Sequence, residues 1–289
     1  MSGEAPSRRF PAPVRLDSFP PLGYDLWVYG IIYIYEFEGD VRDRTPWADD
    51  GDYVGCWLEA GYSFLFFRRE KQDLFQRLHL PYRSELAIRH EDWESGMPLQ
   101  PFKVGRIGIH QPWNAPFEGD INIAIDPNMA FGSGFHFSTK GCLTLLDRLL
   151  SRWRPQRVLD LGTGTGILSL ACLKMGAPLA VAIDDNDLAL RTAANNGRIN
   201  GLGERMLLIK AHAEEMLPIE ADLLIANIHY SALSSLVDRP EFYGRRYYIV
   251  SGMIRGEARA IEERLKERLE LVDRYCEEFW STYLFSQGS

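Results

Sequence analysis

The chain of 289 residues contains few cysteines, and the four it has stand far apart, at Cys56, Cys142, Cys172 and Cys276. Small secreted domains are held by closely spaced cysteines, and structural zinc sites need close pairs, so this spacing disfavours both classes. The six histidines show no pairing on one helical face, and we therefore expect no metal site. Two of the cysteines, Cys142 and Cys172, lie in apolar helical patterns, where cysteine acts as a small hydrophobic side chain.

Long apolar runs and an excess of positive charge are also missing. No stretch of about eighteen apolar residues occurs, and the first residues lack the apolar centre of a signal peptide. We therefore expect a cytoplasmic protein without a membrane partner. The net charge of −8 disfavours direct binding to nucleic acid or anionic lipid, because both need a cationic surface.

What is present is the composition of a globular protein, with 46% hydrophobic and 25% charged residues. Residues 1–20 are rich in proline and without periodicity, which predicts a mobile leader. Residues 21–95 carry aromatic and β-branched runs and one helical pattern, typical of a small α+β domain whose aromatic residues form its own core. Residues 96–120 contain prolines and polar breaks, and we expect a linker with one short strand.

From residue 121 to residue 289 short apolar runs alternate with helical patterns. This alternation predicts an α/β fold, a doubly wound, Rossmann-like sheet covered on both faces. The segment STKGCLTLLDRLLSRW is amphipathic, and Ser138 is the expected N-cap of its helix. After the last helix, two strand-like runs form the expected closing hairpin.

A glycine-rich turn, VLDLGTGTGIL, joins the first expected strand of this domain to a helix. Gly162, Gly164 and Gly166 permit positive φ angles and let a ligand approach the backbone. A dinucleotide fingerprint needs glycine at the position held by Ile167, so the spacing does not match that fingerprint.

The acidic residues around this turn favour S-adenosylmethionine as the ligand. Asp160 precedes the first glycine by two residues and is expected to face the ammonium and sulfonium groups of such a molecule. Thr163 lies between the first two glycines and is placed in the same site. Asp184 ends the next expected strand, 24 residues after Asp160, where an acid can accept hydrogen bonds from ribose hydroxyls.

Asn227 ends a later strand, ADLLIAN, and is expected at the same edge of the sheet. Its side chain can accept a hydrogen bond from an amine and aim the amine lone pair at a methyl carbon, so it is a candidate for both cofactor contact and catalysis. The alternative is that Asn227 only caps the following turn.

A second glycine-rich stretch, AIDPNMAFGSGFHFSTK, lies shortly before the first. Together with VLDLGTGTGILSLACLKMGA and ANI, it resembles the ribosomal protein L11 methyltransferase (PrmA) family over residues 121–285. The positions that match are Asp126, Pro127, Ala130, Phe131, Gly132, Gly134, His136 and Thr139.

The resemblance implies an S-adenosylmethionine-dependent N-methyltransferase whose acceptor is a lysine or α-amine of a protein, such as a ribosomal protein. Its small N-terminal domain would present that substrate. The first loop would cover the cofactor, with Phe131 near the adenosyl group and the backbone of Gly132 and Gly134 near the sulfonium. Asp126 is the nominee for general base, or it only anchors the loop.

Several departures from the family pattern leave the acceptor open. Phe135 and Phe137 stand where the family has threonine and proline, and with Phe131 they either wall a substrate channel or pack beneath the loop. Two other functions therefore remain: methylation of a small-molecule or peptide-derived metabolite, and binding of S-adenosylmethionine without catalysis.

Overall fold

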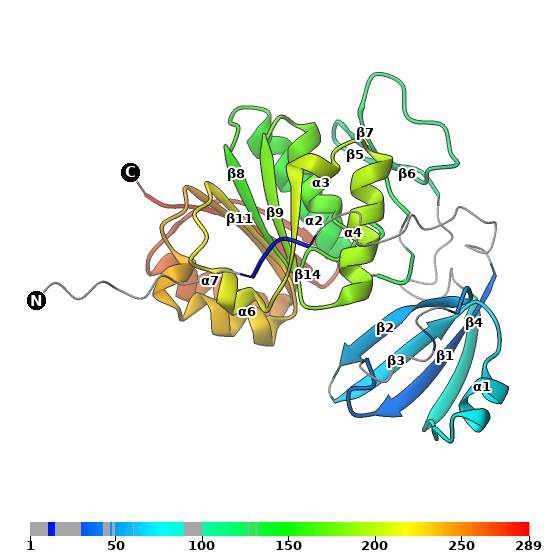
Figure 1. The fold of residues 1–289 in the computed structure, drawn as a ribbon. Coiled ribbons are helices and arrows are strands. Elements are labelled where there is room, and N and C mark those ends of the chain that lie inside the picture. Colours follow the sequence, from blue (N-terminus) through cyan, green and yellow to red (C-terminus); the bar gives the residue numbers. More distant parts are fainter. Residues whose placement is uncertain are drawn as a thin grey trace, which may run out of the picture.

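The computed structural model describes residues 11–14, 30–42, 47, 50–59, 61–89, 100–126, 128–130 and 132–288. Most of the expected leader, Pro127 and Phe131 lie outside these residues. Within them, Val14 forms an isolated antiparallel bridge with Leu208. The described chain folds into three sheets of four, three and seven strands (Figure 1).

The N-terminal sheet has the order β2-β3-β1-β4 and purely antiparallel pairing. Its elements are β1 (Ile31–Glu38), β2 (Tyr53–Glu59), β3 (Tyr62–Phe67), α1 (Gln72–Arg77) and β4 (Ser84–Arg89). Side chains alternate between its two faces, as in any strand. Tyr35, Phe37 and Phe67 pack with Phe75 of α1 on one face, so these aromatic residues do form the core of the unit. The opposite face packs against the large domain.

The expected linker is folded from residue 100 onward. In place of the one expected short strand it contains two, β5 (Phe102–Val104) and β6 (Ile107–His110), which form a small sheet with the following β7 (Ile121–Ala124), parallel to β6. Ile107 and Ile109 are fully buried and belong to the main core. The sequence did not reveal this pairing, because each strand is too short to show a periodic pattern and because prolines and glycines lie between the strands.

The large sheet has the order β10-β9-β8-β11-β12-β14-β13, and only β14 and β13 are antiparallel to their neighbours. Its strands are β8 (Arg157–Leu161), β9 (Leu179–Asp184), β10 (Met206–Lys210), β11 (Leu223–Asn227), β12 (Tyr247–Ile254), β13 (Glu270–Glu277) and β14 (Trp280–Ser286). Its helices are α2 (Phe137–Leu150), α3 (Ile167–Lys174), α4 (Asp187–Ile199), α5 (Ala213–Met216), α6 (Tyr230–Val237) and α7 (Arg255–Lys266). Helices α2, α3 and α4 cover one face, and α6 and α7 cover the other (Figure 1). The expected Rossmann-like α/β fold and closing hairpin are confirmed.

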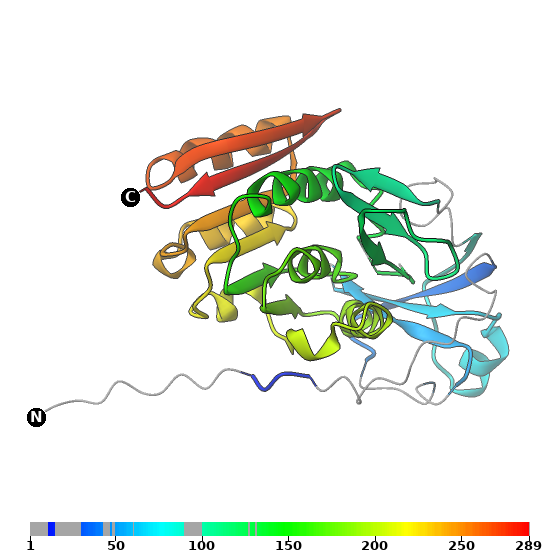
Figure 2. The same ribbon diagram turned by 90° about the horizontal axis from the view of Figure 1, so that it is seen from above.

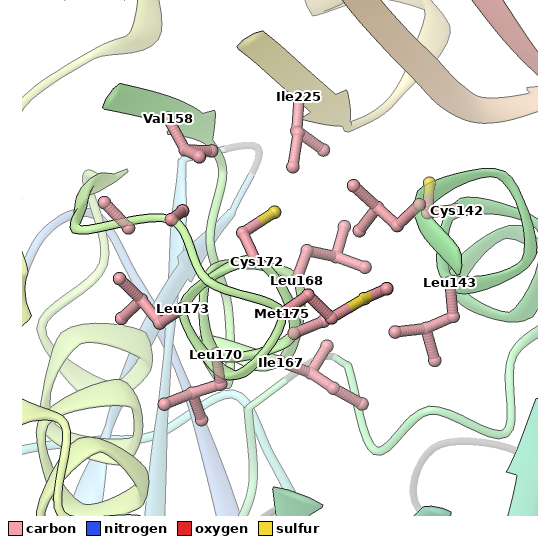
Figure 3. Packing of buried hydrophobic residues seen from close by; sticks show 14 of the residues in the cluster. Cys142, Leu143, Val158, Ile167, Leu168, Leu170, Cys172, Leu173, Met175 and Ile225 are labelled. Carbon is pink, nitrogen blue, oxygen red and sulfur yellow. The ribbon is translucent and has the colours of Figure 1, made fainter. Parts of the chain in front are cut away.

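Helix α3, which starts directly after the glycine turn, is buried over its whole length except Lys174. Such an apolar helix is stable only inside a core. Figure 3 shows Leu168 and Cys172 on the side of Val158 and Ile225, which come from β8 and β11. Cys142 of α2 lies in the same cluster, so both cysteines serve as small hydrophobic side chains, as expected. This packing holds the glycine turn in place.

Of the helices in the described part of the chain, none combines the length and apolar character needed to cross a membrane.

Candidate functional site

A cavity of about 390 Å³ lies at the carboxyl ends of the parallel strands, the edge where open α/β sheets bind ligands. Its size is within the ordinary range for a small-molecule site. The lining residues are Trp57, Gly132, His136, Ser138, Thr139, Gly162, Thr163, Gly164, Ile167, Leu168, Asp184, Asp185, Asn227, Ile228, His229, Ala232, Gly252 and Trp280. A larger cavity of about 740 Å³ lies at the opposite edge, near Arg157, Asp222 and Arg245, and contains none of the predicted site residues.

The glycine turn after β8 has the predicted left-handed geometry. Gly162, Gly164 and Gly166 have φ angles of 71°, 55° and 82°, a region that other residues rarely adopt. A Cβ on Gly162 would lie 2.4 Å from Cγ2 of Ile228, which leaves no room for a side chain. The turn therefore presents bare backbone to the cavity.

Asp160 lies beneath this turn instead of in the cavity wall. It is almost fully buried, and its Oδ2 accepts hydrogen bonds of 2.7 Å from the hydroxyls of Thr163 and Ser169. Its Oδ1 is buried without a hydrogen-bond partner among the described residues, and burial raises the pKa of the carboxyl. Because Asp160 does not line the cavity, the structure supports an indirect role, in which it fixes Thr163.

Asp184 stands at the end of β9 and lines the cavity. The backbone N–H of Gly164 donates to its Oδ2 at 2.9 Å, and that of Asn186 donates to its Oδ1 at 3.0 Å. An ionised carboxylate has about four acceptor positions, so roughly two remain for a ligand. Burial raises the pKa of Asp184 to about 7.

The two glycine loops contact each other through Thr165. The Thr165 hydroxyl donates to the carbonyl oxygen of Gly132 at 2.6 Å, and a Cβ on Gly132 would lie 2.9 Å from that hydroxyl. Gly132 lines the cavity, whereas Gly134 does not. A Cβ on Gly134 would lie 2.8 Å from the ring of Phe102 and 3.0 Å from Ile167, so Gly134 permits close packing.

The aromatic residues of the first loop that the structure describes, Phe135 and Phe137, do not form a channel wall. Phe135 is buried, and its ring lies 4.8 Å from that of Phe102. Phe137 begins α2, with Lys140 over its ring. Neither lines the cavity, so of the two alternatives packing is observed for Phe135. Phe131 lies outside the described residues.

Asp126 is buried at the base of the first loop and is not among the cavity residues. The backbone N–H of Asn128 donates to its Oδ1 at 3.2 Å, and Nδ2 of Asn195 donates to its Oδ2 at 3.4 Å. The side chain of Asn196 bonds both the N–H and the carbonyl oxygen of Asp126. Of its two expected roles, the geometry supports loop anchoring and does not place Asp126 beside Asn227.

Asn227 ends β11 and lines the cavity. Its Nδ2 donates to the hydroxyl of Thr139 at 3.3 Å, while its Oδ1 is buried without a hydrogen-bond partner among the described residues. The N-cap position of the following helix is His229, which makes no side-chain cap hydrogen bond, so Asn227 does not stand at that position. A buried, unsatisfied acceptor is costly unless a ligand completes it.

Among the described residues, twelve of the eighteen that line the cavity were not predicted as site residues, and four of these twelve carry an indole or imidazole ring: Trp57, His136, His229 and Trp280. His136, not Ser138, is the N-cap of α2, because its Nδ1 accepts from the N–H of Ser138. Its ring lies edge-on to that of Trp280 at 4.3 Å. Burial and the nearby His229 lower the pKa of His136 and favour a neutral imidazole. Of these four, His136 belongs to the family motif and His229 follows Asn227 by two residues, whereas Trp57 and Trp280 reach the cavity through tertiary packing.

The sheet order gives the cavity a direction. Asp184 ends β9, Asn227 ends β11, and Trp280 begins β14 beside the end of β12. Neighbouring strands are about 4.8 Å apart, so Asn227 lies about 10 Å along the edge from Asp184, and Trp280 about 10 Å further. The cavity thus has an acidic end at Asp184 and an aromatic end at Trp280, with the unpaired Asn227 oxygen between them.

Comparisons with known proteins point to one family. The family model of ribosomal protein L11 methyltransferase (PrmA) matches residues 68–287. Among similar curated proteins, the ribosomal protein L11 methyltransferase of Caldanaerobacter subterraneus is 32% identical over 208 residues, 69% of this chain and 66% of that protein. The one of Citrifermentans bemidjiense is 35% identical over 212 residues, 69% of this chain and 68% of that protein.

Among solved structures, a ribosomal protein L11 methylase from Lactobacillus delbrueckii has a TM-score of 0.58 and 24% identity. The match covers 66% of this chain and 100% of that structure, and it supports the fold. The matched curated relatives are covered over about two thirds of their length. Because the family model spans most of the chain, the chain belongs to the ribosomal protein L11 methyltransferase (PrmA) family.

Proposed function

We propose that the protein is an S-adenosylmethionine-dependent N-methyltransferase that acts in the cytoplasm on a lysine or α-amine of a protein, with ribosomal protein L11 as the first candidate acceptor. The observation that carries the proposal is the buried, unpaired Oδ1 of Asn227, placed between an acidic end and an aromatic end of one cavity. The relatives, which are ribosomal protein L11 methyltransferases, support a protein acceptor.

The acidic end fits the nucleoside of this cofactor. The remaining acceptor positions of Asp184 suit the two ribose hydroxyls, and the bare turn at Gly164 lets the methionyl part lie against backbone. Gly132 forms the opposite wall, held by Thr165. Asp160 acts through Thr163. The place of Phe131 near the adenosyl group stays a prediction from the family motif, and Gly134, which is not among the cavity residues, acts through the packing of the loop on Phe102 and Ile167.

The bound cofactor supplies an electrophilic methyl group on a sulfonium centre. The acceptor amine must arrive without its extra proton, and a free lysine has a pKa near 10.4, so most of it is protonated at neutral pH. Trp280, Ile228 and the neutral His136 make the acceptor end poorly solvating for a cation, which favours the uncharged amine. The Asn227 oxygen then accepts one amine N–H and orients the lone pair toward the methyl carbon.

The test is transfer of label from methyl-labelled cofactor in two acceptor mixtures: purified ribosomal protein L11, and lysate from a strain lacking this protein. We expect label on L11 and on one protein band of the lysate. Label on another protein would retain the N-methyltransferase and change the acceptor. Label only in the small-molecule fraction would replace it with a metabolite methyltransferase, and cofactor binding without any transfer would leave a binding module. An Asn227→Ala preparation is the matched control for background labelling.

A further inference from the structure

The cavity wall contains one residue from the N-terminal sheet, Trp57 of β2. Among the described residues, all others that line the cavity come from the chain beyond residue 130. The indole of Trp57 therefore reaches a site otherwise built by the large domain and the loop before it. The packing of β2 against the large domain holds Trp57 in this position.

The placement of Trp57 follows from strand geometry. Gly55 and Trp57 are two residues apart on β2 and so point to the same face of the sheet. A Cβ on Gly55 would lie 2.7 Å from Cδ1 of Leu188, so β2 packs directly on the first turn of α4. Helix α4 begins three residues after Asp184, which places Trp57 at the acidic end of the cavity, where Asp184 and Asp185 are also lining residues. Figure 2 shows the N-terminal strands, in blue, beside α4, in yellow-green.

The contact between the sheet and the large domain is a buried apolar cluster. It consists of Ile32, Ile34, Val54, Phe66, Met129 and Leu188, with Trp57 packed against it. Met129 belongs to the first glycine loop, and Leu188 belongs to α4. The cluster thus ties the N-terminal sheet to two of the segments that surround the cavity, and Trp57 is held by packing.

We propose that the indole of Trp57 packs against the nucleoside of the bound cofactor, so that the N-terminal sheet forms one wall of the cofactor site. The inference rests on the proposed function. Asp184 holds the ribose, and a flat indole at the same end offers an apolar face to the nucleoside. Cofactor affinity then depends on the packing of the N-terminal sheet against α4. Because of this contact, binding of an acceptor protein to the N-terminal sheet changes the affinity for the cofactor.

The experiment compares binding of S-adenosylhomocysteine, by calorimetry, to the full-length wild type and to variants whose folding is checked by circular dichroism. Trp57→Ala is expected to raise Kd about tenfold, the loss of one aromatic contact, and Trp57→Phe only about two- to threefold. Gly55→Ala, which disturbs the sheet–α4 contact without altering a cavity residue, is expected to raise Kd severalfold. Trp153→Phe is the matched control, because Trp153 packs with Tyr247 away from the cavity.

Fluorescence gives an independent readout. The chain has seven tryptophans. Quenching on addition of S-adenosylhomocysteine is expected to shrink in Trp57→Phe and to persist in Trp153→Phe. If Trp57→Ala binds with wild-type affinity and the quenching in Trp57→Phe is unchanged, the inference is wrong while the proposed function stands. If the wild type itself does not bind S-adenosylhomocysteine, both the proposed function and this inference are wrong.

Discussion

The pH dependence of cofactor binding offers the sharpest test of the site, because it follows from one carboxyl group. Burial raises the pKa of Asp184 from 3.8 to about 7. The proposed ligand needs the ionised form, since a protonated carboxyl loses acceptor positions for the ribose hydroxyls. With a pKa of about 7, roughly nine tenths of the protein is ionised at pH 8 and roughly one tenth at pH 6. The Kd for S-adenosylhomocysteine is therefore expected to be about tenfold higher at pH 6 than at pH 8.

The same shift has a consequence for stability, with a defined sign. A carboxyl whose pKa is raised on folding favours the folded state when it is protonated. The free energy of unfolding of the protein without ligand therefore falls as the pH rises from about 4 to about 7. The difference between 3.8 and about 7 corresponds to on the order of 4 kcal/mol. Ligand binding to the ionised form should therefore raise the melting temperature more at pH 8 than at pH 6.

The assay is calorimetry at pH 6, 7 and 8 and constant ionic strength, with thermal melts in parallel. Asp184→Asn is the control: it should bind S-adenosylhomocysteine more weakly than the wild type, with the same Kd at all three pH values. A wild-type Kd that stays flat between pH 6 and pH 8 would refute the assignment of Asp184 to the ribose. A slope that persists in Asp184→Asn would assign the titration to another group.

Three further predictions concern the loops and the acceptor. Gly164→Val should abolish binding of S-adenosylhomocysteine in calorimetry, because a β-branched residue at a φ of 55° would distort the turn and fill the methionyl position; unchanged affinity would contradict that placement. Asn227→Ala should lower kcat at least about a hundredfold and change cofactor Kd less than about threefold, whereas equal losses would indicate a structural role. Thr165→Val should lower the free energy of unfolding by about 0.5 to 1.5 kcal/mol in denaturant titration, because it removes the hydrogen bond that the Thr165 hydroxyl donates to the carbonyl oxygen of Gly132; Thr165→Ser, which keeps the hydroxyl, is the control, and an equal loss in both variants would contradict this reasoning.

Much of the fold was contained in local sequence patterns. Buried parallel strands are continuous apolar runs, so RVLDL, LAVAID and LLIAN could be recognised one by one, and their alternation with helices fixed a doubly wound sheet. The glycine turn was equally explicit, because three alternate glycines before an apolar helix have few other uses. In the linker the sequence indicated one short strand, and the division into β5 and β6 and their pairing with β7 were missed because three or four residues cannot show a period.

The residues of the site likewise fall into those that local sequence patterns predicted and those that only tertiary packing placed. The sequence by itself determined the turn at Gly164 and the acid at Asp184, because the end of a strand and the start of the next helix are adjacent in the chain. Only the tertiary structure decided that Asp160 and Asp126 lie outside the cavity while Trp57 and Trp280 lie in its wall. Those positions depend on how a separate sheet packs on α4 and how a C-terminal hairpin joins β12, and contacts between segments so far apart in the chain leave no local pattern to read.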